Sequence, residues 1–222
     1  LLGAVATADD AHMEKYVAGE EFAPEEIIEG LKKGGAAGEI CPVFAGIQQT
    51  GAAVPLMVDT LLKILPSAAD AVCRFEGGEE KAFDENGENA LFVFKTIADP
   101  FVGKLSYFRV LSGKIKNDSR LINNRTGAEE RLSKIMWLKG GKQEDAGEII
   151  AGDIGSVSKL GNVLTGDTLS ASGKLAAAAV EFPAPTISVA VYPKAKGDEE
   201  KITQAFSRLC EEDPTIKVYT DN

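Results

Sequence analysis

The sequence predicts a multi-domain chain: an α/β segment, an all-β barrel and the start of a β-α-β unit. Three observations predict this organisation. Residues 1–68 follow the order helix, strand, helix, which is the rhythm of an α/β domain. Residues 69–181 begin with an acidic, turn-rich stretch and continue as short apolar runs between Gly, Asn and Asp turns, a pattern typical of a barrel or sandwich. Residues 182–222 alternate strand, amphipathic helix and strand.

The composition is that of an ordinary globular protein. Of 222 residues, 44% are hydrophobic and 26% are charged, and no apolar run reaches the ~18 residues of a membrane span. Cys41, Cys73 and Cys210 are far apart and form no CxxC pair, which indicates free thiols in a cytoplasmic protein. The formal net charge of −10 argues against autonomous binding to a phosphate backbone. We therefore expect neither a membrane nor DNA as a partner.

The first segment predicts two helices around one strand. Pro24 and the two glutamates after it start a helix, which runs to Lys33 and stops at Gly34-Gly35. CPVFAG, residues 41–46, predicts a short buried strand. Apolar residues then recur at helical spacing from Val54 until Pro66 ends the second helix.

Six apolar runs predict the strands of the barrel in the second segment. They are Leu91–Ile97, Leu105–Leu111, Arg120–Asn123, Leu132–Leu138, Ile154–Leu160 and Thr168–Ser170. Trp137 is expected to pack on the barrel or cover it partly. The acidic stretch before the strands, residues 69–89, predicts a linker or loop. His12, the only histidine, lies in a polar helix start and is expected on the surface.

The third segment predicts a β-α-β unit. Ile187, Val189 and Val191 alternate as a strand, Asp198 can cap the helix, and Asp213 ends it before a second strand at residues 216–218. A lone unit of this kind leaves strand edges uncovered, so we expect the natural protein to continue beyond residue 222.

Five stretches, in order along the chain, resemble consecutive parts of elongation factor G, a translational GTPase. They are AAGEICPVFAG with the later LPSA, ADPFVGKLSYFRVLSGKI from Ala98 to Ile115, RTGAEERLSKIMWL, AGDIGSVSKLGNVLTGDTL and PAPTISVAVYPKAKGDEEKITQAFSRLCEEDPTIKV. The resemblance implies that residues 1–68 are the end of a G domain and residues 69–181 a linker with the translation-factor barrel, domain II. Residues 182–222 would start domain III, an α+β domain with a ferredoxin-like β-α-β unit.

The same resemblance implies a ribosomal translocation GTPase whose barrel couples the GTP state to ribosome contact. GTP and magnesium would be the cofactors of the parent protein. The phosphate-cradling GxxxxGK[ST] loop and the NKxD guanine reader do not occur in this chain. Asp84-Glu85-Asn86-Gly87 fits DxxG only within the acidic stretch. We therefore expect no catalytic residue, no metal site, no bound cofactor and no GTP hydrolysis by this chain alone.

One nucleotide-contacting loop of the family is implied at Gly46, Ile47 and Gln48, where the family reads Gly-Ser-Ala and its backbone helps hold the guanine. The serine and alanine are both replaced here. A ribosome-protection factor or a divergent paralogue of the same family therefore remains an alternative to a translocation factor.

A stand-alone barrel that binds a small ligand or RNA is an alternative of another class. Basic residues in the barrel and beyond could contact phosphates. They are Lys114 with Lys116, Arg125 with Arg131 and Lys134, Lys139 with Lys142, and Lys194 with Lys196.

Overall fold

The computed structural model describes residues 1–99, 102–195 and 197–219. Pro100, expected in the turn after Asp99, and Lys196 lie outside the described residues. The chain divides into two compact units, Leu1–Asp70 and Ala71–Asn222, and each is described by itself. In the described part no helix is long and apolar enough to cross a membrane.

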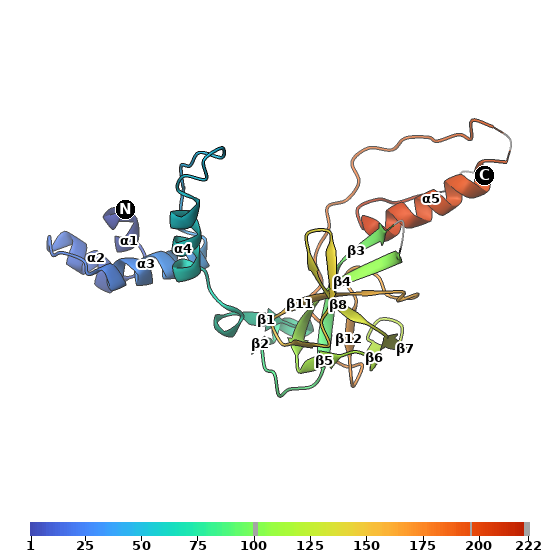
Figure 1. Cartoon of the computed structure of the whole chain (residues 1–222), viewed down its shortest axis with the longest axis horizontal. Helices are drawn as coiled ribbons and strands as arrows, with labels where there is room; N and C mark the ends of the chain where they lie inside the picture. Colours follow the sequence, from blue (N-terminus) through green and yellow to red (C-terminus); the bar gives the residue numbers. More distant parts are fainter. Residues whose placement is uncertain (100–101, 196, 220–222) are drawn as a thin grey trace. The chain divides into compact units, whose positions relative to one another are not determined.

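The first unit is helical (Figure 1). Its elements are α1 Leu2–Ala6, α2 Asp10–Val17, α3 Pro24–Ala37, α4 Val54–Ile64 and the 3-10 turn η1 Ala68–Asp70. The predicted start of α3 and the predicted second helix are both confirmed. The predicted stop at Gly34-Gly35 is wrong, because α3 continues until Gly38 adopts a left-handed φ of 76°. Gly34 instead permits close packing, since a Cβ there would clash with the Ile40 side chain.

The predicted buried strand over residues 41–46 is also wrong. This segment makes no strand pairing in the described part, and Val43 is 91% exposed. A strand needs a neighbour for its backbone N–H and C=O groups, and no described element of the first unit provides one. The prediction that His12 lies on the surface is wrong too, since only 9% of the residue is exposed.

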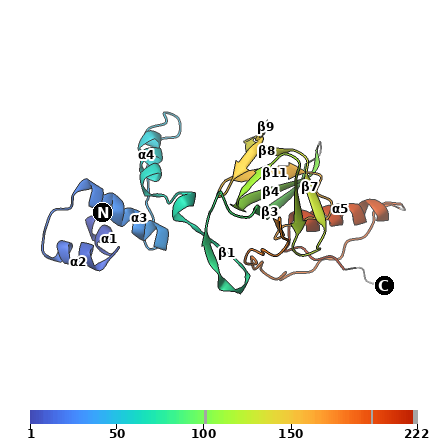
Figure 2. The same ribbon diagram turned by 90° about the horizontal axis from the view of Figure 1, so that it is seen from below.

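The second unit is built on a curled antiparallel sheet, seen from two sides in Figures 1 and 2. The strands follow the order β7-β6-β12-β3-β4-β11-β8-β9. Their bounds are β3 Ala90–Asp99, β4 Gly103–Ser112, β6 Ser119–Asn123, β7 Glu129–Leu132, β8 Ile135–Lys139, β9 Lys142–Asp145, β11 Ile154–Ser158 and β12 Thr168–Ser170. A separate pair joins β5 Lys114–Lys116 to β10 Glu148–Ile150.

The sheet confirms the predicted all-β barrel as a half-barrel. All six predicted runs form strands, although the run Leu132–Leu138 is divided between the end of β7 and β8. Register shifts in β3, between Ala90 and Leu91 and between Val93 and Lys95, mark β-bulges opposite β4. Bulges bend a strand and increase its twist, which helps the sheet to curl.

The concave side of the sheet encloses one main core. Its buried members are Leu91, Val93, Phe108, Val110, Ile115, Leu121, Leu132, Ile135, Ile149, Val157, Leu160, Val163 and Leu169. Trp137 packs against this core while partly exposed, as predicted. Fully burying an aliphatic or aromatic side chain contributes about 1.5–3 kcal/mol, so this core is the main source of stability of the unit.

The acidic stretch at residues 71–89 is not a plain linker. It contains the hairpin of β1 Val72–Arg74 and β2 Glu80–Ala82, with the 3-10 turn η2 Glu76–Gly78 between them. Cys73 and Phe75 are buried in a second core cluster, beside Ala90 and Leu111 of the sheet. Two alternate apolar side chains within an acidic sequence therefore help to attach this stretch to the barrel.

The Asp84–Gly87 match to DxxG is a turn that packs on the barrel. The Asp84 side chain accepts from the Asn86 N–H at 2.9 Å, and its carbonyl accepts from the Gly113 N–H at 2.8 Å. These bonds explain Asp84 structurally, and a Cβ at Gly87 would clash with the Ser112 hydroxyl, which explains the glycine.

The last element is the helix α5 Glu199–Glu212, with Asp198 and Asp213 at its two caps as predicted. The Asp198 side chain makes no capping hydrogen bond. The two predicted flanking strands are not formed; Ile187 and Val189 are 80% and 77% exposed. Like residues 41–46, these segments lack a strand to pair with in the described part.

Candidate functional site

Two loops of the barrel meet at a hydrogen-bonded polar site beside β12. The first loop joins β6 to β7 and is shaped by Asn123. The Asn123 side-chain oxygen accepts from the N–H groups of Arg125 and Thr126 at 2.9 and 3.3 Å. Its backbone N–H donates to the Ala128 carbonyl at 2.9 Å, which closes the loop. This local turn aims the Arg125 side chain at the second loop.

The second loop, residues 161–167, precedes β12. The Leu164 N–H donates to the Asp167 carboxylate at 2.9 Å, so the loop folds back on its own last residue. The Gly166 N–H donates to the Val93 carbonyl at 2.7 Å and fastens the loop to β3. The Asp167 side chain is consequently held at the inner edge of the barrel, where only 4% of it is exposed.

Asp167 joins the two loops through a bidentate ion pair. Arg125 Nε donates to Asp167 Oδ1 at 2.7 Å, and Arg125 Nη2 donates to Oδ2 at 2.9 Å. Asn123 Nδ2 donates to the same Oδ2 at 2.7 Å. Arg125 Nη2 also reaches the Asn162 carbonyl at 3.0 Å. We call Asn123, Arg125 and Asp167 the loop clamp.

The electrostatics of the loop clamp favour the charged forms. Burial by itself would raise the pKa of Asp167, but the hydrogen bonds from Arg125, Leu164 and Asn123 outweigh it and lower the pKa below its ordinary value. The hydrogen bond to Asp167 in turn raises the pKa of Arg125. The clamp therefore stays an ion pair at neutral pH.

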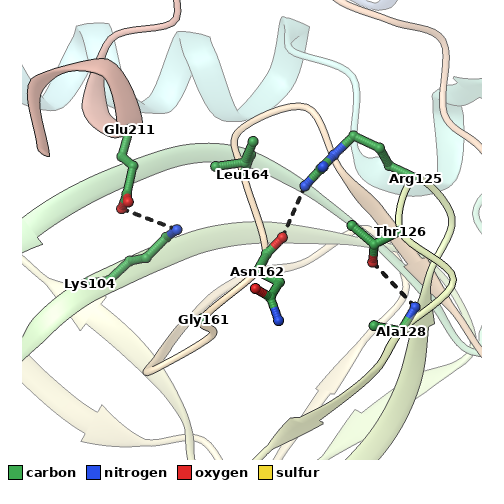
Figure 3. A pocket seen from close by; sticks show the side chains of 8 residues that line it. All are labelled: Lys104, Arg125, Thr126, Ala128, Gly161, Asn162, Leu164 and Glu211. Carbon is green, nitrogen blue, oxygen red and sulfur yellow. Dashed lines mark hydrogen bonds and ion pairs between the residues drawn. The ribbon is translucent and has the colours of Figure 1, made fainter. Parts of the chain in front are cut away.

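A pocket of about 450 Å³ lies beside the loop clamp (Figure 3). Its lining comprises Lys104, Arg125, Thr126, Ala128, Gly161, Asn162, Leu164 and Glu211. Figure 3 shows Lys104 of β4 and Glu211 of α5 turned toward each other, with a separation of 3.2 Å between Nζ and Oε2. The Ala98 N–H of β3 also donates to the Glu212 carboxylate. Through these contacts α5 borders the pocket.

The polar side chains that line this pocket are suited to positioning a bound group through charge and hydrogen bonds. The described residues that line it include no serine, cysteine or histidine. In the described part no cluster of three or more His, Cys, Asp and Glu side chains could hold a metal ion. Each of the two cations pairs with a carboxylate, Lys104 with Glu211 and Arg125 with Asp167, so the lining is polar where the barrel and α5 meet.

The predicted loop Gly46, Ile47 and Gln48 lies in the first unit. All three residues are exposed, and the Ile47 N–H donates to the Ala52 carbonyl at 3.3 Å across a tight turn. A Cβ at Gly46 would lie 2.8 Å from the same carbonyl oxygen, which explains the glycine by close backbone approach. The nucleotide contact of this loop stays a prediction.

Most of the barrel's predicted basic clusters face carboxylates across the surface. The ion pairs are Lys114–Glu85, Lys116–Glu148, Arg131–Asp118, Lys134–Asp145 and Lys139–Glu144. Each pair neutralises a charge that a phosphate would otherwise meet, so these clusters do not form a basic face by themselves.

Two comparisons with known proteins agree with this architecture. Residues 88–172 match the family model described as Elongation factor G domain 2, and residues 182–222 match Elongation Factor G, domain III. A crystal structure of a protein from Thermus thermophilus is similar, with 26% sequence identity and a TM-score of 0.73. The match covers 98% of this chain and 31% of the Thermus chain.

The curled barrel and the two matched domains in sequence define a translation-factor chain. The chain belongs to the elongation factor G-like family, as the sequence resemblance implied. The loop clamp lies inside the matched domain 2, and the lining of its pocket includes Glu211 from the matched domain III.

Proposed function

We propose that this chain is part of a ribosomal translocation GTPase, in which the barrel couples the GTP state to ribosome contact. The observation that carries the proposal is the order of the matches, with domain 2 at residues 88–172 followed directly by domain III at residues 182–222. The contacts of Lys104 and Ala98 with α5 support it, since they give the barrel a physical connection to the next domain. The ribosome is the proposed partner, and the cytoplasm the proposed location.

GTP and magnesium belong, in this proposal, to parts of the parent protein that carry the phosphate loop and the guanine reader. Residues 1–68 would be the end of that G domain, and the loop at Gly46, Ile47 and Gln48 would approach the guanine. The 222-residue chain contributes no phosphate-cradling GxxxxGK[ST] loop. Its role is then mechanical coupling, with hydrolysis carried out elsewhere in the protein.

The first test compares this chain with the whole gene product. The purified 222-residue chain should release no phosphate from GTP above the buffer rate. The whole product should hydrolyse GTP, and ribosomes should stimulate it. Saturable turnover by the chain alone would contradict the proposal that hydrolysis takes place elsewhere in the protein. GTP hydrolysis by the whole product that ribosomes do not stimulate would contradict the ribosome as the partner.

The second test separates translocation from the family alternatives. A translocation factor should advance transfer RNA and messenger RNA on pre-translocation ribosomes in a toe-printing assay. If the whole product hydrolyses GTP on ribosomes but leaves the messenger in place, the protein is a ribosome-protection factor or a paralogue. The isoleucine and glutamine at positions 47 and 48, in place of Ser and Ala, are the observation that keeps this second candidate open.

A further inference from the structure

His12 occupies an unusual place for the only histidine of the chain. It lies in the first turn of α2, where only 9% of the residue is exposed. Its ring stacks on Phe22, with 5.9 Å between ring centroids and 16° between ring planes. The aromatic face is thus covered, and the two ring nitrogens point at two separate acceptors.

Both partners of the ring are hydrogen-bond acceptors. His12 Nδ1 lies 2.6 Å from the Asp9 carboxylate oxygen Oδ1, and Nε2 lies 3.2 Å from the Glu26 backbone carbonyl. Neither a carboxylate nor a carbonyl can donate a proton. A neutral imidazole has one N–H group and can satisfy only one of the two, whereas an imidazolium ion has two. The geometry therefore matches the doubly protonated ring.

The contacts join two helices. Asp9 is the N-cap of α2, and its Oδ1 also accepts from the His12 backbone N–H at 2.9 Å. Glu26 lies in the first turn of α3, and its carboxylate takes an ion pair from Lys15 of α2. We propose that protonated His12 is a pH-controlled joint between the starts of α2 and α3, which opens at the Glu26 carbonyl when the ring loses a proton.

The charged neighbours act in opposite directions on this joint. The hydrogen bond that His12 donates to Asp9 is the main cause that raises the pKa of His12 above 6.5, with burial opposing it and the bond to the Glu26 carbonyl adding to it. Lys33 of α3 lies 2.7 Å from Asp9 Oδ2, and its positive charge works against His12 protonation. Glu29 offsets part of that charge through its own contact with Lys33 at 2.9 Å.

The sign of the pH effect follows from the raised pKa. The stabilising contribution of His12 is fully present below the unfolded value of 6.5, and it is lost as the pH rises through the higher folded value. After deprotonation the stronger contact to Asp9 keeps the remaining proton on Nδ1. Nε2 then faces the Glu26 carbonyl with a lone pair, and the α2–α3 contact weakens.

A titration of the full 222-residue chain by nuclear magnetic resonance tests the proposal directly. Because the chain has one histidine, its imidazole nitrogens give a single pair of signals without assignment. At pH 6.5 more than half of the rings should be imidazolium ions, and the midpoint should lie above pH 6.5. A neutral ring at that pH, or a midpoint at or below it, would overturn the joint.

Two variants should move the titration midpoint of His12 in opposite directions, and a control variant should not move it. Asp9→Asn keeps a capping side chain but removes the charge, so the midpoint should fall. Lys33→Gln removes the opposing cation and should raise the midpoint. Lys32→Gln removes a neighbouring cation on α3 that pairs with Asp70 and should leave the midpoint unchanged. A midpoint that moves down in Lys33→Gln contradicts the proposal even if Asp9→Asn fails to fold.

Discussion

At the scale of single residues, Asp167 shows how a buried carboxylate is made tolerable. It receives four hydrogen bonds from Asn123, Leu164 and Arg125, with two of them from the arginine. A buried charge is costly unless it is paired and hydrogen-bonded, and here both conditions are met. The removal of one charge therefore disturbs more than one contact.

Asp167→Asn should destabilise the barrel unit by about 2–3 kcal/mol. Breaking a buried ion pair costs about 3–5 kcal/mol, and a smaller cost is expected here because about half of the Arg125 side chain is already exposed to water. Urea unfolding at neutral pH, followed by the fluorescence of Trp137, measures the change.

The matched control is Asp118→Asn, which breaks another arginine–carboxylate pair. Arg131 Nε and Nη2 both donate to Asp118 Oδ1, at 3.0 and 2.7 Å, but both side chains are about 60% exposed. Exposed pairs contribute about 0–1 kcal/mol, so this variant should change the stability little. Equal effects of the two substitutions would show that burial does not decide the strength of the clamp.

The stability of the barrel should fall in acid because of the same residue. The pKa of Asp167 is lowered on folding, so its contribution is present above the unfolded value of 3.8 and is lost as the pH falls through the folded value. The urea midpoint of the wild type should therefore decrease below about pH 4. The decrease should be smaller in Asp167→Asn; identical acid profiles would assign the effect to other carboxylates.

At the scale of elements, β11 depends on a residue without a side chain. Gly155 faces Phe108 on the neighbouring strand β4, and a Cβ there would clash with Ile149 and lie 2.9 Å from Phe108 Cζ. Gly155→Ala should destabilise the unit by about 1–3 kcal/mol through overpacking. Gly141→Ala is the control, because a Cβ there meets nothing within 4 Å. Thermal unfolding of both variants measures the difference. A Gly155→Ala variant as stable as the wild type would refute the tight fit at this position.

The attachment of α5 should depend on Lys104. Its ion pair with Glu211 is partly covered, since 16% of the lysine and 39% of the glutamate side chain are exposed. Lys104→Gln should speed hydrogen exchange in α5 by up to about fivefold, corresponding to at most ~1 kcal/mol for such a pair. Lys201→Gln, which breaks the outer pair with Asp198 on the same helix, should leave the end near Glu211 unchanged. Equal exchange in both variants would argue against the attachment.

Local patterns of apolar runs and turns could be predicted from the sequence. Whether each predicted strand finds a partner strand could not. The strands of the barrel are indicated by apolar runs between turns, and each finds a partner strand in the same unit. Residues 41–46 and 187–191 have the same apolar pattern but no partner strand among the described residues, so they stay unpaired. Pattern alone does not reveal that difference.

The loop clamp could not be predicted for a related reason. Arg125 and Asp167 are 42 positions apart, so no local spacing joins them. The sequence pattern presents Asn123 as the end of a strand and Arg125 only as one member of a basic cluster. The available signal is an aspartate immediately before a buried strand, a place where a charge must have a partner.

At the scale of the whole molecule, charge decides between a coupling domain and an RNA-binding module. The net charge is −10, and most barrel cations face carboxylates. Labelled single-stranded RNA should therefore show no saturable change in anisotropy at ~50 mM or ~150 mM salt, since backbone binding rests on unpaired cations. Saturable binding at low salt that weakens at the higher salt would support the module instead.

The hairpin of β1 and β2 determines how the barrel unit would respond to mechanical tension. The Ala178 N–H donates to the Arg74 carbonyl and the Glu76 N–H to the Ala176 carbonyl, each at 2.9 Å, so the chain enters and leaves the barrel side by side and antiparallel. Tension applied to the two ends of the barrel would open these bonds one after another, as a zipper opens. A pull between the flanking segments would therefore break these hydrogen bonds first, before the register of the eight-stranded sheet changes.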